Sequence, residues 1–354
     1  MKKNILFSTT RQWNPGDEFI LLGIINLLSE ILGDFNSVIF NRSPEVRQVK
    51  SYLNPFRTLA WSNLSFSGKK NIEAFFRIGF YDNSFKESMD ASFIDYVVFA
   101  GSPEWMGRRS SLLYDVILRY DIPTLYLGIG SSNIISYDMI KERYKRVLER
   151  AKLIIVRDEP TRDILKPLTP VKLSCPALFA SREGKEIPFL QRIALIFSTH
   201  KAVRSNRVSQ ETSVYLVSLY KALAKRYECE IICHYIDELP EAFYHFPGQQ
   251  IHYSYDSKDY LEIYRKFDFV IGPRVHGIGI CASYGIPGIL ISHDLRADTA
   301  RGFGAKIITT GTDLAEVVSL IEERRRLLRE STESLRRLKM HMKSEYLQYL
   351  RRVL

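Results

Sequence analysis

The residues best suited to chemistry lie at 272–285, in the segment GPRVHGIGICASYG. A short apolar run, DFVI at 268–271, precedes this segment and small residues follow it, so Arg274 and His276 stand where a strand gives way to a helix. The first turn of a helix presents free backbone N–H groups and a partial positive charge, which suit a phosphate or a carboxylate. Arg274 adds a fork for an anion, His276 exchanges a proton near neutral pH, and Gly277 lets the helix pack closely or admits a ligand. We therefore expect an anion-handling active site in which His276 is the acid or base.

Polar residues also follow other apolar runs, and several of them permit a purely structural interpretation. Residues 14–18, Asn-Pro-Gly-Asp-Glu, follow the run KNILFS, where Asp17 is suited either to cap a helix or to line a substrate loop. Arg157 and Asp158 end the run AKLIIV, where they are suited either to pair with each other or to face a ligand. Because ligands bind at the carboxyl ends of parallel strands, we expect these side chains to share one site. The residues expected to line the rest of the cleft are Asn14, Asp17, Glu18, Glu104 and Arg296.

The sequence contains no signature of a cofactor or a metal. The glycine-containing turns at 101–105 and 128–132 do not form GxGxxG with a suitably spaced acidic residue, and GxxxxGK[ST] is missing. The four cysteines lack paired CxxC spacing, so neither a zinc site nor a disulfide framework is indicated. We expect no metal and no bound cofactor, and the scattered thiols favour a reducing cytoplasm.

The apolar runs alternate with helical patterns, which is typical of an α/β protein with parallel sheets. Strands are expected at 3–8, 36–41, 96–101, 124–130 and 151–159, and again at 192–197, 230–236, 268–272, 288–292 and 306–310. The order of a strand, a helical stretch and an Ile-Pro pair recurs at 95–124 and 268–288, which favours two Rossmann-like units side by side. We expect an N-terminal domain at 1–180, a polar linker at 181–191 and a second domain at 190–320.

Residues 321–354 predict a basic C-terminal helix that packs back across the first domain. They contain ten Lys or Arg against five Asp or Glu, which accounts for half of the net charge of +10. A basic surface favours phosphorylated substrates, polyanions or an anionic membrane face, and a solvated helix face is the simpler explanation.

The chain resembles the polysaccharide pyruvyl transferases. The resemblance is carried by the segments 14–18, 128–130 and 157–158, and most strongly by 268–277 with the downstream segments 285–287 and 294–296. These pieces occur in the order typical of the family. Two segments depart from its pattern: 101–105 reads Gly-Ser-Pro-Glu-Trp where a glycine triplet is common, and 175–177 reads Cys-Pro-Ala where Pro-Asp is common.

The resemblance implies two Rossmann-like domains that face a cleft in a glycosyltransferase B-like arrangement. It implies transfer of pyruvyl from phosphoenolpyruvate, as a co-substrate, onto two hydroxyls of a sugar, with a cyclic ketal and phosphate as products. Arg157, Arg274 and His276 match the positions that hold the donor anion, with Gly277 at the same site and His276 as the acid or base. The acceptor would be a sugar of a glycan or of a lipid-linked intermediate, and Asp17, Glu18 and Glu104 are unranked candidates for activating its hydroxyl.

Two other functions remain open at the level of the sequence. One is a nucleotide-sugar-dependent glycosyltransferase of the same fold, since a fold does not dictate its chemistry. The other is a non-catalytic protein that binds polyanions, based on the net charge. We do not expect nucleic acid as a partner, because interleaved aromatic and basic stripes are missing. The expected location is the cytoplasm, with peripheral contact to the inner membrane face through residues 321–354.

Overall fold

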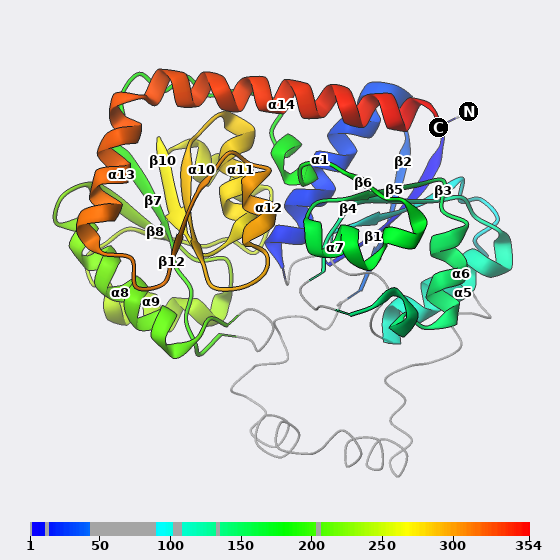
Figure 1. Cartoon of the computed structure of the whole chain (residues 1–354), viewed down its shortest axis with the longest axis horizontal. Helices are drawn as coiled ribbons and strands as arrows, with labels where there is room; N and C mark the ends of the chain where they lie inside the picture. Colours follow the sequence, from blue (N-terminus) through cyan, green and yellow to red (C-terminus); the bar gives the residue numbers. More distant parts are fainter. Residues whose placement is uncertain (1, 11–13, 43–89, 102–107, 132–134, 203–206) are drawn as a thin grey trace, which may run out of the picture.

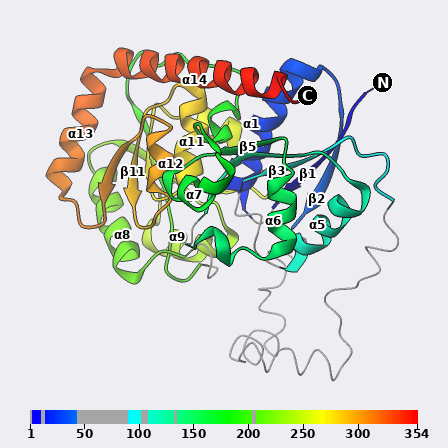
Figure 2. The same ribbon diagram turned by 45° about the vertical axis from the view of Figure 1, so that its right-hand side comes forward.

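The computed structural model of the chain describes residues 2–10, 14–42, 90–101, 108–131, 135–202 and 207–354, and at 108–111 it describes only the backbone. These residues form two α/β halves that lie side by side (Figure 1). Each half contains a six-stranded parallel sheet, ordered β2-β1-β3-β4-β5-β6 in the first and β12-β11-β10-β7-β8-β9 in the second. Helices pack around both sheets (Figure 2). The predicted fold class, α/β with two Rossmann-like domains, is confirmed.

The central strands of the first sheet are almost wholly apolar because helices cover both of its faces. Residues 5–9 of the first strand, for instance, are all buried. The elements of this half are β1 (Asn4–Thr9), α1 (Pro15–Leu32), β2 (Asn36–Asn41), β3 (Tyr96–Ala100), α5 (Arg108–Tyr120), β4 (Thr124–Ile129), η3 (Tyr137–Met139), α6 (Glu142–Glu149), β5 (Leu153–Val156), α7 (Glu159–Ile164), η4 (Lys166–Leu168), β6 (Val171–Lys172) and η5 (Pro176–Phe179).

The second half repeats this pattern after a connection that contains the predicted linker. Its elements are β7 (Arg192–Ile196), α8 (Gln210–Ala224), β8 (Glu228–Ile232), η6 (Ile236–Glu238), α9 (Leu239–His245), β9 (Ile251–His252), α10 (Asp259–Arg265), β10 (Phe269–Gly272), α11 (Val275–Tyr284), β11 (Gly288–Ser292), α12 (Ala297–Arg301), β12 (Lys306–Thr309), α13 (Leu314–Arg326) and α14 (Leu328–Arg351). Every expected strand is present. The sequence pattern did not predict β6 and β9. These are edge strands of two residues each and are too short to show a periodic pattern.

Residues 321–354 fall on two helices, α13 and α14, with a break at Leu327. Figure 1 shows α14 running along the top of both halves, as expected for a C-terminal helix that packs back. Its buried Tyr346 donates a hydrogen bond to the carbonyl of Ser174 at 2.9 Å in the first half. Arg336 donates to the carbonyl of Lys185 at 3.0 Å next to the second half. This helix therefore holds the two halves together. Among all the described helices, none is both long and apolar enough to cross a membrane.

The first helix, α1, packs tightly on the η5 turn at the end of the first half. A Cβ atom added at Gly23 would lie 1.8 Å from the backbone oxygen of Pro176. On the other side of this proline, a Cβ atom added at Gly128 would lie 2.0 Å from its Cδ atom. Pro176 is thus wedged between α1 and β4, which holds α1, and the residues at its N-terminus, in one position.

We expect the substitution Gly23→Ala to destabilise the protein, because the added methyl group meets rigid backbone rather than the end of a flexible side chain. Overpacking of this kind costs about 1–3 kcal/mol of unfolding free energy, and sometimes more. Urea denaturation would measure the change. Gly184→Ala is the matched control, because the nearest heavy atom to its added Cβ is 3.9 Å away. Equal stability of the two variants would contradict the close packing of α1 on Pro176.

Candidate active site

Arg274 lies at the carboxyl end of β10, where the strand order of the second sheet reverses. The chain continues from β7 to β8 on one side and reaches β10 on the other side. The ends of β7 and β10 therefore flank the position at which open α/β sheets bind ligands. Arg274 is also the N-cap residue of α11, so the first N–H groups of this helix follow it directly in the chain.

The Arg274 side chain is 6% exposed and is held by two residues from the segment that follows β8. Its Nη2 atom lies 2.5 Å from the Oε1 atom of Glu238, and its guanidinium carbon lies 4.6 Å from the centre of the Tyr235 ring. Its Nε and Nη1 atoms are buried and have no hydrogen-bond partner among the residues that the structure describes. Because buried N–H groups are nearly always paired, these two atoms are poised for a ligand.

His276 follows in the first turn of α11, directly against the first half of the molecule. A Cβ atom added at Gly16 would lie 2.3 Å from the Nδ1 atom of His276, so this contact requires a glycine. The Nε2 atom of His276 is buried and, within the described part of the chain, has no hydrogen-bond partner. Burial, followed by the positive charges of Arg157 and Arg296, holds the pKa of His276 well below its usual value of 6.5. The imidazole is therefore neutral at pH 7.

Arg157 is contributed by the first half, immediately after β5. Its side chain is 6% exposed, and its Nε and Nη1 atoms are buried without a hydrogen-bond partner among the described residues, although Nε lies 3.7 Å from the Oδ2 atom of Asp158. A Cβ atom added at Gly130 would lie 2.3 Å from the Nε atom of Arg157, so the glycine makes room for the guanidinium group. The next residue, Asp158, accepts a hydrogen bond from the hydroxyl of Thr299 at 3.3 Å, so Arg157 lies at the boundary with the second half. Arg157 therefore comes from the first half and His276 from the second, with Arg274 two residues before His276 at the start of α11.

The two halves are clasped beside this cluster. The backbone N–H of Glu159 at the start of α7 donates to the Asp298 carboxylate of α12 at 2.8 Å. The hydroxyl of Thr299 donates to the carboxylate of Asp158 at 3.3 Å. Helices α1, α7, α11 and α12 accordingly meet in the middle of the molecule (Figures 1 and 2).

This arrangement, with two arginines and a histidine at an interdomain helix start, can be compared with known proteins. The model of the family described as polysaccharide pyruvyl transferase matches residues 14–294, most of the chain. The chain belongs to this family. It is accordingly a transferase, and the resemblance predicted from the motifs is confirmed.

Solved structures show that the family member has a widely used fold. A putative UDP-N-acetylglucosamine 2-epimerase from Listeria monocytogenes is 12% identical, with a TM-score of 0.55 over 95% of this chain and 90% of that one. An S. aureus MnaA–UDP co-structure is 10% identical, with a TM-score of 0.55 over 94% and 91% of the two chains. MurG from Acinetobacter baumannii is 15% identical, with a TM-score of 0.50 over 98% and 99%. These likenesses show a glycosyltransferase B-like fold. No curated protein matches the chain.

Two of the residues expected on the acceptor side of this transferase bind the other half of the molecule. Asn14 caps α1 through its Oδ1 atom, which accepts from the N–H of Gly16 at 3.1 Å and from the hydroxyl of Tyr235 at 3.0 Å. Glu18 accepts a hydrogen bond from the hydroxyl of Ser257 and is 4% exposed. Both side chains therefore join α1 to the second half, and their contact with an acceptor stays a prediction.

The other predicted acceptor residues lie apart from one another. Asp17 is buried and pairs with Arg42 at 3.2 Å, near Gly101 at the end of β3. Glu104 lies outside the described residues. Arg296 donates through Nε to the Asp294 carboxylate at 2.8 Å, and only part of its side chain is exposed. Asp17 thus lies at the switch point of the first sheet, and Arg296 lies between β11 and α12 in the second half.

Gly277 has a clear packing role. A Cβ atom added there would lie 2.4 Å from the Cδ1 atom of Ile196 and 2.7 Å from the hydroxyl of Tyr264. Its N–H donates to the carbonyl of Arg274 at 3.0 Å, within the first turn of α11. The glycine brings α11 close to the sheet, while its expected contact with the donor stays a prediction.

Sequence reasoning missed Tyr235 and Glu238, the two residues that hold Arg274. The available signal was their place after β8, with Tyr235 near the end of the run EIICHYI and Glu238 just beyond it. His293 follows β11, and burial lowers its pKa to about 4 although the nearby Asp294 opposes this shift. Within the described part of the chain, no group of three His, Cys, Asp or Glu residues is placed to hold a metal ion.

Proposed function

We propose that this family member transfers the pyruvyl group of phosphoenolpyruvate onto two hydroxyls of a sugar in a glycan or a lipid-linked glycan. The products would be a cyclic ketal and phosphate. One observation carries the proposal: within the described part of the chain, Arg157 and Arg274 each keep buried Nε and Nη1 atoms without hydrogen-bond partners, and the Nε2 atom of His276 also lacks one. Two guanidinium groups suit a small ligand with two anionic groups, and phosphoenolpyruvate carries a carboxylate and a phosphate.

The proposed reaction needs one proton donor and two hydroxyl nucleophiles. A proton added to the methylene carbon of phosphoenolpyruvate makes a methyl group and leaves C2 electrophilic. One sugar hydroxyl attacks C2 and loses its proton, and the second displaces phosphate, loses its proton and closes the ketal. The phosphate takes up one of the released protons, so that no proton is consumed overall.

His276 is the residue proposed to move these protons. It is neutral at pH 7 because burial and the charges of Arg157 and Arg296 lower its pKa. Bound phosphoenolpyruvate is an anion, so it would offset the positive charges near His276 and raise the pKa of this residue. His276 would then gain a proton when the donor arrives. In that state it is suited to protonate either the methylene carbon or the departing phosphate.

Ligand-dependent thermal stability tests the proposed donor against a nucleotide. At about 100 times its dissociation constant, a ligand that binds only the folded state adds about 2.7 kcal/mol of unfolding free energy. We expect phosphoenolpyruvate to raise the melting temperature and UDP to leave it unchanged. Stabilisation by UDP and not by phosphoenolpyruvate would instead support a nucleotide-sugar-dependent glycosyltransferase. The Arg274→Ala variant is the control, because it should lose most of the phosphoenolpyruvate effect.

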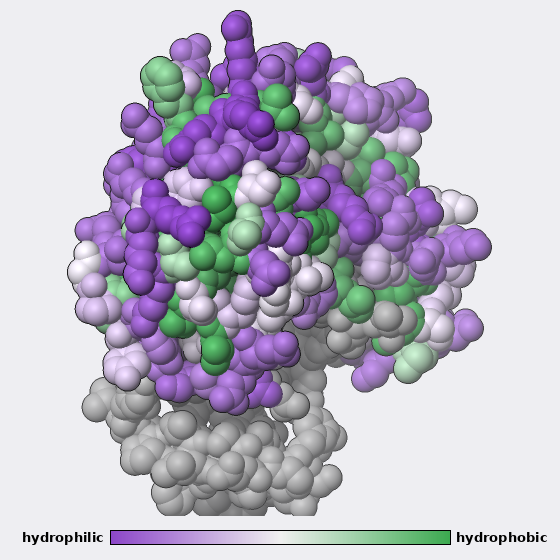
Figure 3. Space-filling model, turned by 60° about the vertical axis from the view of Figure 1, so that its left-hand side comes forward, coloured by the Kyte–Doolittle hydropathy of each residue, from purple (hydrophilic) through white to green (hydrophobic). Residues whose placement is uncertain are grey.

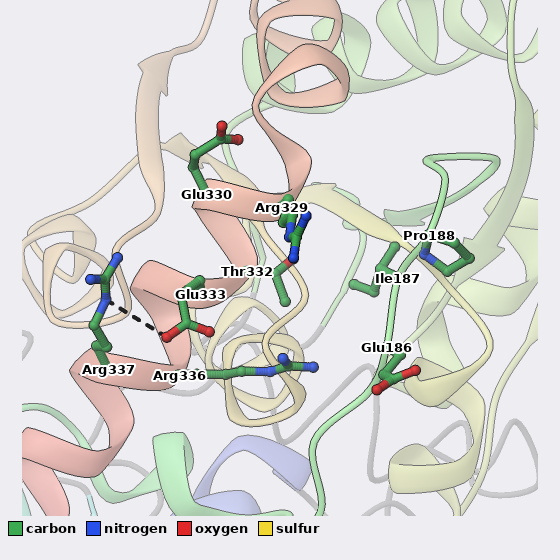
Figure 4. A pocket seen from close by; sticks show the side chains of 9 residues that line it. All are labelled: Glu186, Ile187, Pro188, Arg329, Glu330, Thr332, Glu333, Arg336 and Arg337. Carbon is green, nitrogen blue, oxygen red and sulfur yellow. Dashed lines mark ion pairs between the residues drawn. The ribbon is translucent and has the colours of Figure 1, made fainter.

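The pocket beside α14 gives little support to the rival function of polyanion binding. It measures about 790 Å³ and is lined by three arginines and three glutamates (Figure 4). One of these pairs, Arg337 and Glu333, lies at a distance of 3.9 Å. The balanced charges offer no net attraction for a polyanion. The surrounding outer surface of the second half is mostly hydrophilic with scattered apolar residues (Figure 3).

Peripheral contact with an anionic membrane would have to use the exposed arginines of α13 and α14. Several basic residues of this segment are already engaged, such as Lys339 with the carbonyl of Ser181 at 2.8 Å and Lys343 with Glu30. Truncating the segment would remove buried core residues. Flotation with anionic liposomes should therefore compare the full chain with a variant in which the exposed Arg326, Arg337 and Arg351 are replaced by glutamine. Equal flotation of both would count against a membrane role for this surface.

A further inference from the structure

Glu238 is a fully buried residue whose carboxylate contacts Arg274, one of the residues of the proposed donor site. Its exposure is 0%, and it ends the short η6 turn after β8. Its Oε2 atom accepts hydrogen bonds from the backbone N–H groups of His234 at 2.8 Å and Tyr235 at 3.0 Å. Its Oε1 atom accepts from Arg274 at 2.5 Å and from the Ser198 hydroxyl at 3.4 Å. The carboxylate therefore ties β8, β7 and the start of α11 to one another.

These contacts divide the two oxygens of Glu238 between two tasks. The backbone N–H groups fix Oε2, and this anchors the carboxyl group in one orientation. Oε1 then faces the Arg274 guanidinium group and engages its Nη2 atom, while the Tyr235 ring lies against the guanidinium carbon. The nitrogens of Arg274 that remain without partners are Nε and Nη1. A long, flexible arginine side chain would otherwise sample many rotamers, and ordering it beforehand lowers the entropy cost of binding an anion.

We propose that Glu238 is a positioning residue, which fixes Arg274 so that its Nε and Nη1 atoms stay available to the anionic donor. This inference rests on the proposed role of Arg274 in binding phosphoenolpyruvate. Glu238 does not contact the donor itself and acts only through Arg274. Its removal would leave a buried guanidinium group with one fewer partner and free to leave its binding geometry.

The substitution Glu238→Gln separates the two tasks. The amide has one oxygen, so it can accept either from the backbone N–H groups or from Arg274, and its NH₂ group must face donors on the other side. Glu238→Asp serves as a second variant, because it keeps the charge that balances buried Arg274 but shortens the reach. Glu241→Gln is the matched control, because Glu241 lies three residues away and pairs with Lys201 at 2.7 Å rather than with Arg274.

A double-mutant cycle on phosphoenolpyruvate binding, measured by isothermal titration calorimetry, tests the proposal. We expect Glu238→Gln to weaken binding about tenfold in the wild-type background, the factor that corresponds to losing one hydrogen bond between charged groups. In the Arg274→Ala background the same change should alter binding less than about twofold, because the residue through which Glu238 acts is gone. Glu238→Asp should weaken binding in the same background-dependent way, and Glu241→Gln should leave it unchanged.

Equal weakening by Glu238→Gln in both backgrounds would overturn the positioning role and point to a general loss of structure. If the wild-type protein does not bind phosphoenolpyruvate, the proposed function fails, and Glu238 is then judged by a crystal structure of the Glu238→Gln variant. Displacement of the Arg274 guanidinium group there would support the positioning role, whereas an unchanged Arg274 would refute it. The two proposals can therefore fail separately.

Discussion

The variant His276→Ala is expected to lower kcat by about 10²- to 10⁴-fold while the protein remains folded, since this is the usual contribution of a general acid or base. His276 lies at the start of α11 against Gly16, with a buried Nε2 atom that has no hydrogen-bond partner. Alanine removes the only side chain of the proposed donor cluster that can exchange a proton near neutral pH. Phosphate release from phosphoenolpyruvate, measured with a sugar acceptor present, gives the rate. Binding of phosphoenolpyruvate should change much less, because both arginines are retained.

The same variant has a second, independent signature in its stability. The folded state holds the pKa of His276 well below 6.5, so below about pH 6.5 the unfolded chain binds more protons at this residue than the native protein does. The wild-type protein should therefore lose stability as the pH falls through this range, and His276→Ala should lose less. Urea denaturation between about pH 7.5 and 5.5 measures the difference. The variant His341→Ala, an exposed position on α14, controls for the loss of a histidine as such. Normal turnover in folded His276→Ala would rule out its role as acid or base.

Much of the fold follows from the sequence for a simple physical reason. Strands that are buried on both faces must be apolar, so runs such as LIIV in β5 and FVIG in β10 can be recognised as strands from the sequence. The residue that follows such a run lies at the carboxyl edge of its sheet, and this is why Arg157 and Arg274 could be assigned to one site. The break between α13 and α14 at Leu327 is marked by neither glycine nor proline, and it was not predictable from local pattern.

The partners of the site residues depend on strand order, which the sequence does not display. Glu238 follows β8, and β7 lies between β8 and β10 in the sheet, so only the topology brings Glu238 to Arg274. In the same way, Asn14 and Glu18 were expected to face an acceptor, whereas Tyr235 and Ser257 from the second half occupy their oxygens. A motif at a strand end thus indicates where a residue lies, and the packing of the two halves decides what it meets.

The two arginines should each contribute to the apparent affinity for the donor, because both are proposed to bind it. We expect Arg157→Ala and Arg274→Ala each to raise the KM for phosphoenolpyruvate by about 10- to 100-fold, the loss of one or two hydrogen bonds between charged groups. The effect on kcat should be smaller. Arg162→Ala is the matched control, because Arg162 lies one turn along α7, is half exposed and pairs with Glu159.

The pH dependence of kcat/KM should differ between these two variants. The charge of Arg157 lowers the pKa of His276, whereas Arg274 is not among the causes of that shift. Removing Arg157 therefore raises the pKa of His276 towards its usual value, and the limb of the profile that reports this titration moves to higher pH. Removing Arg274 weakens donor binding but leaves the limb in place. Identical limbs in the wild type and in Arg157→Ala would show that the two halves do not bring Arg157 and His276 into one electrostatic unit, and the interdomain site would have to be abandoned.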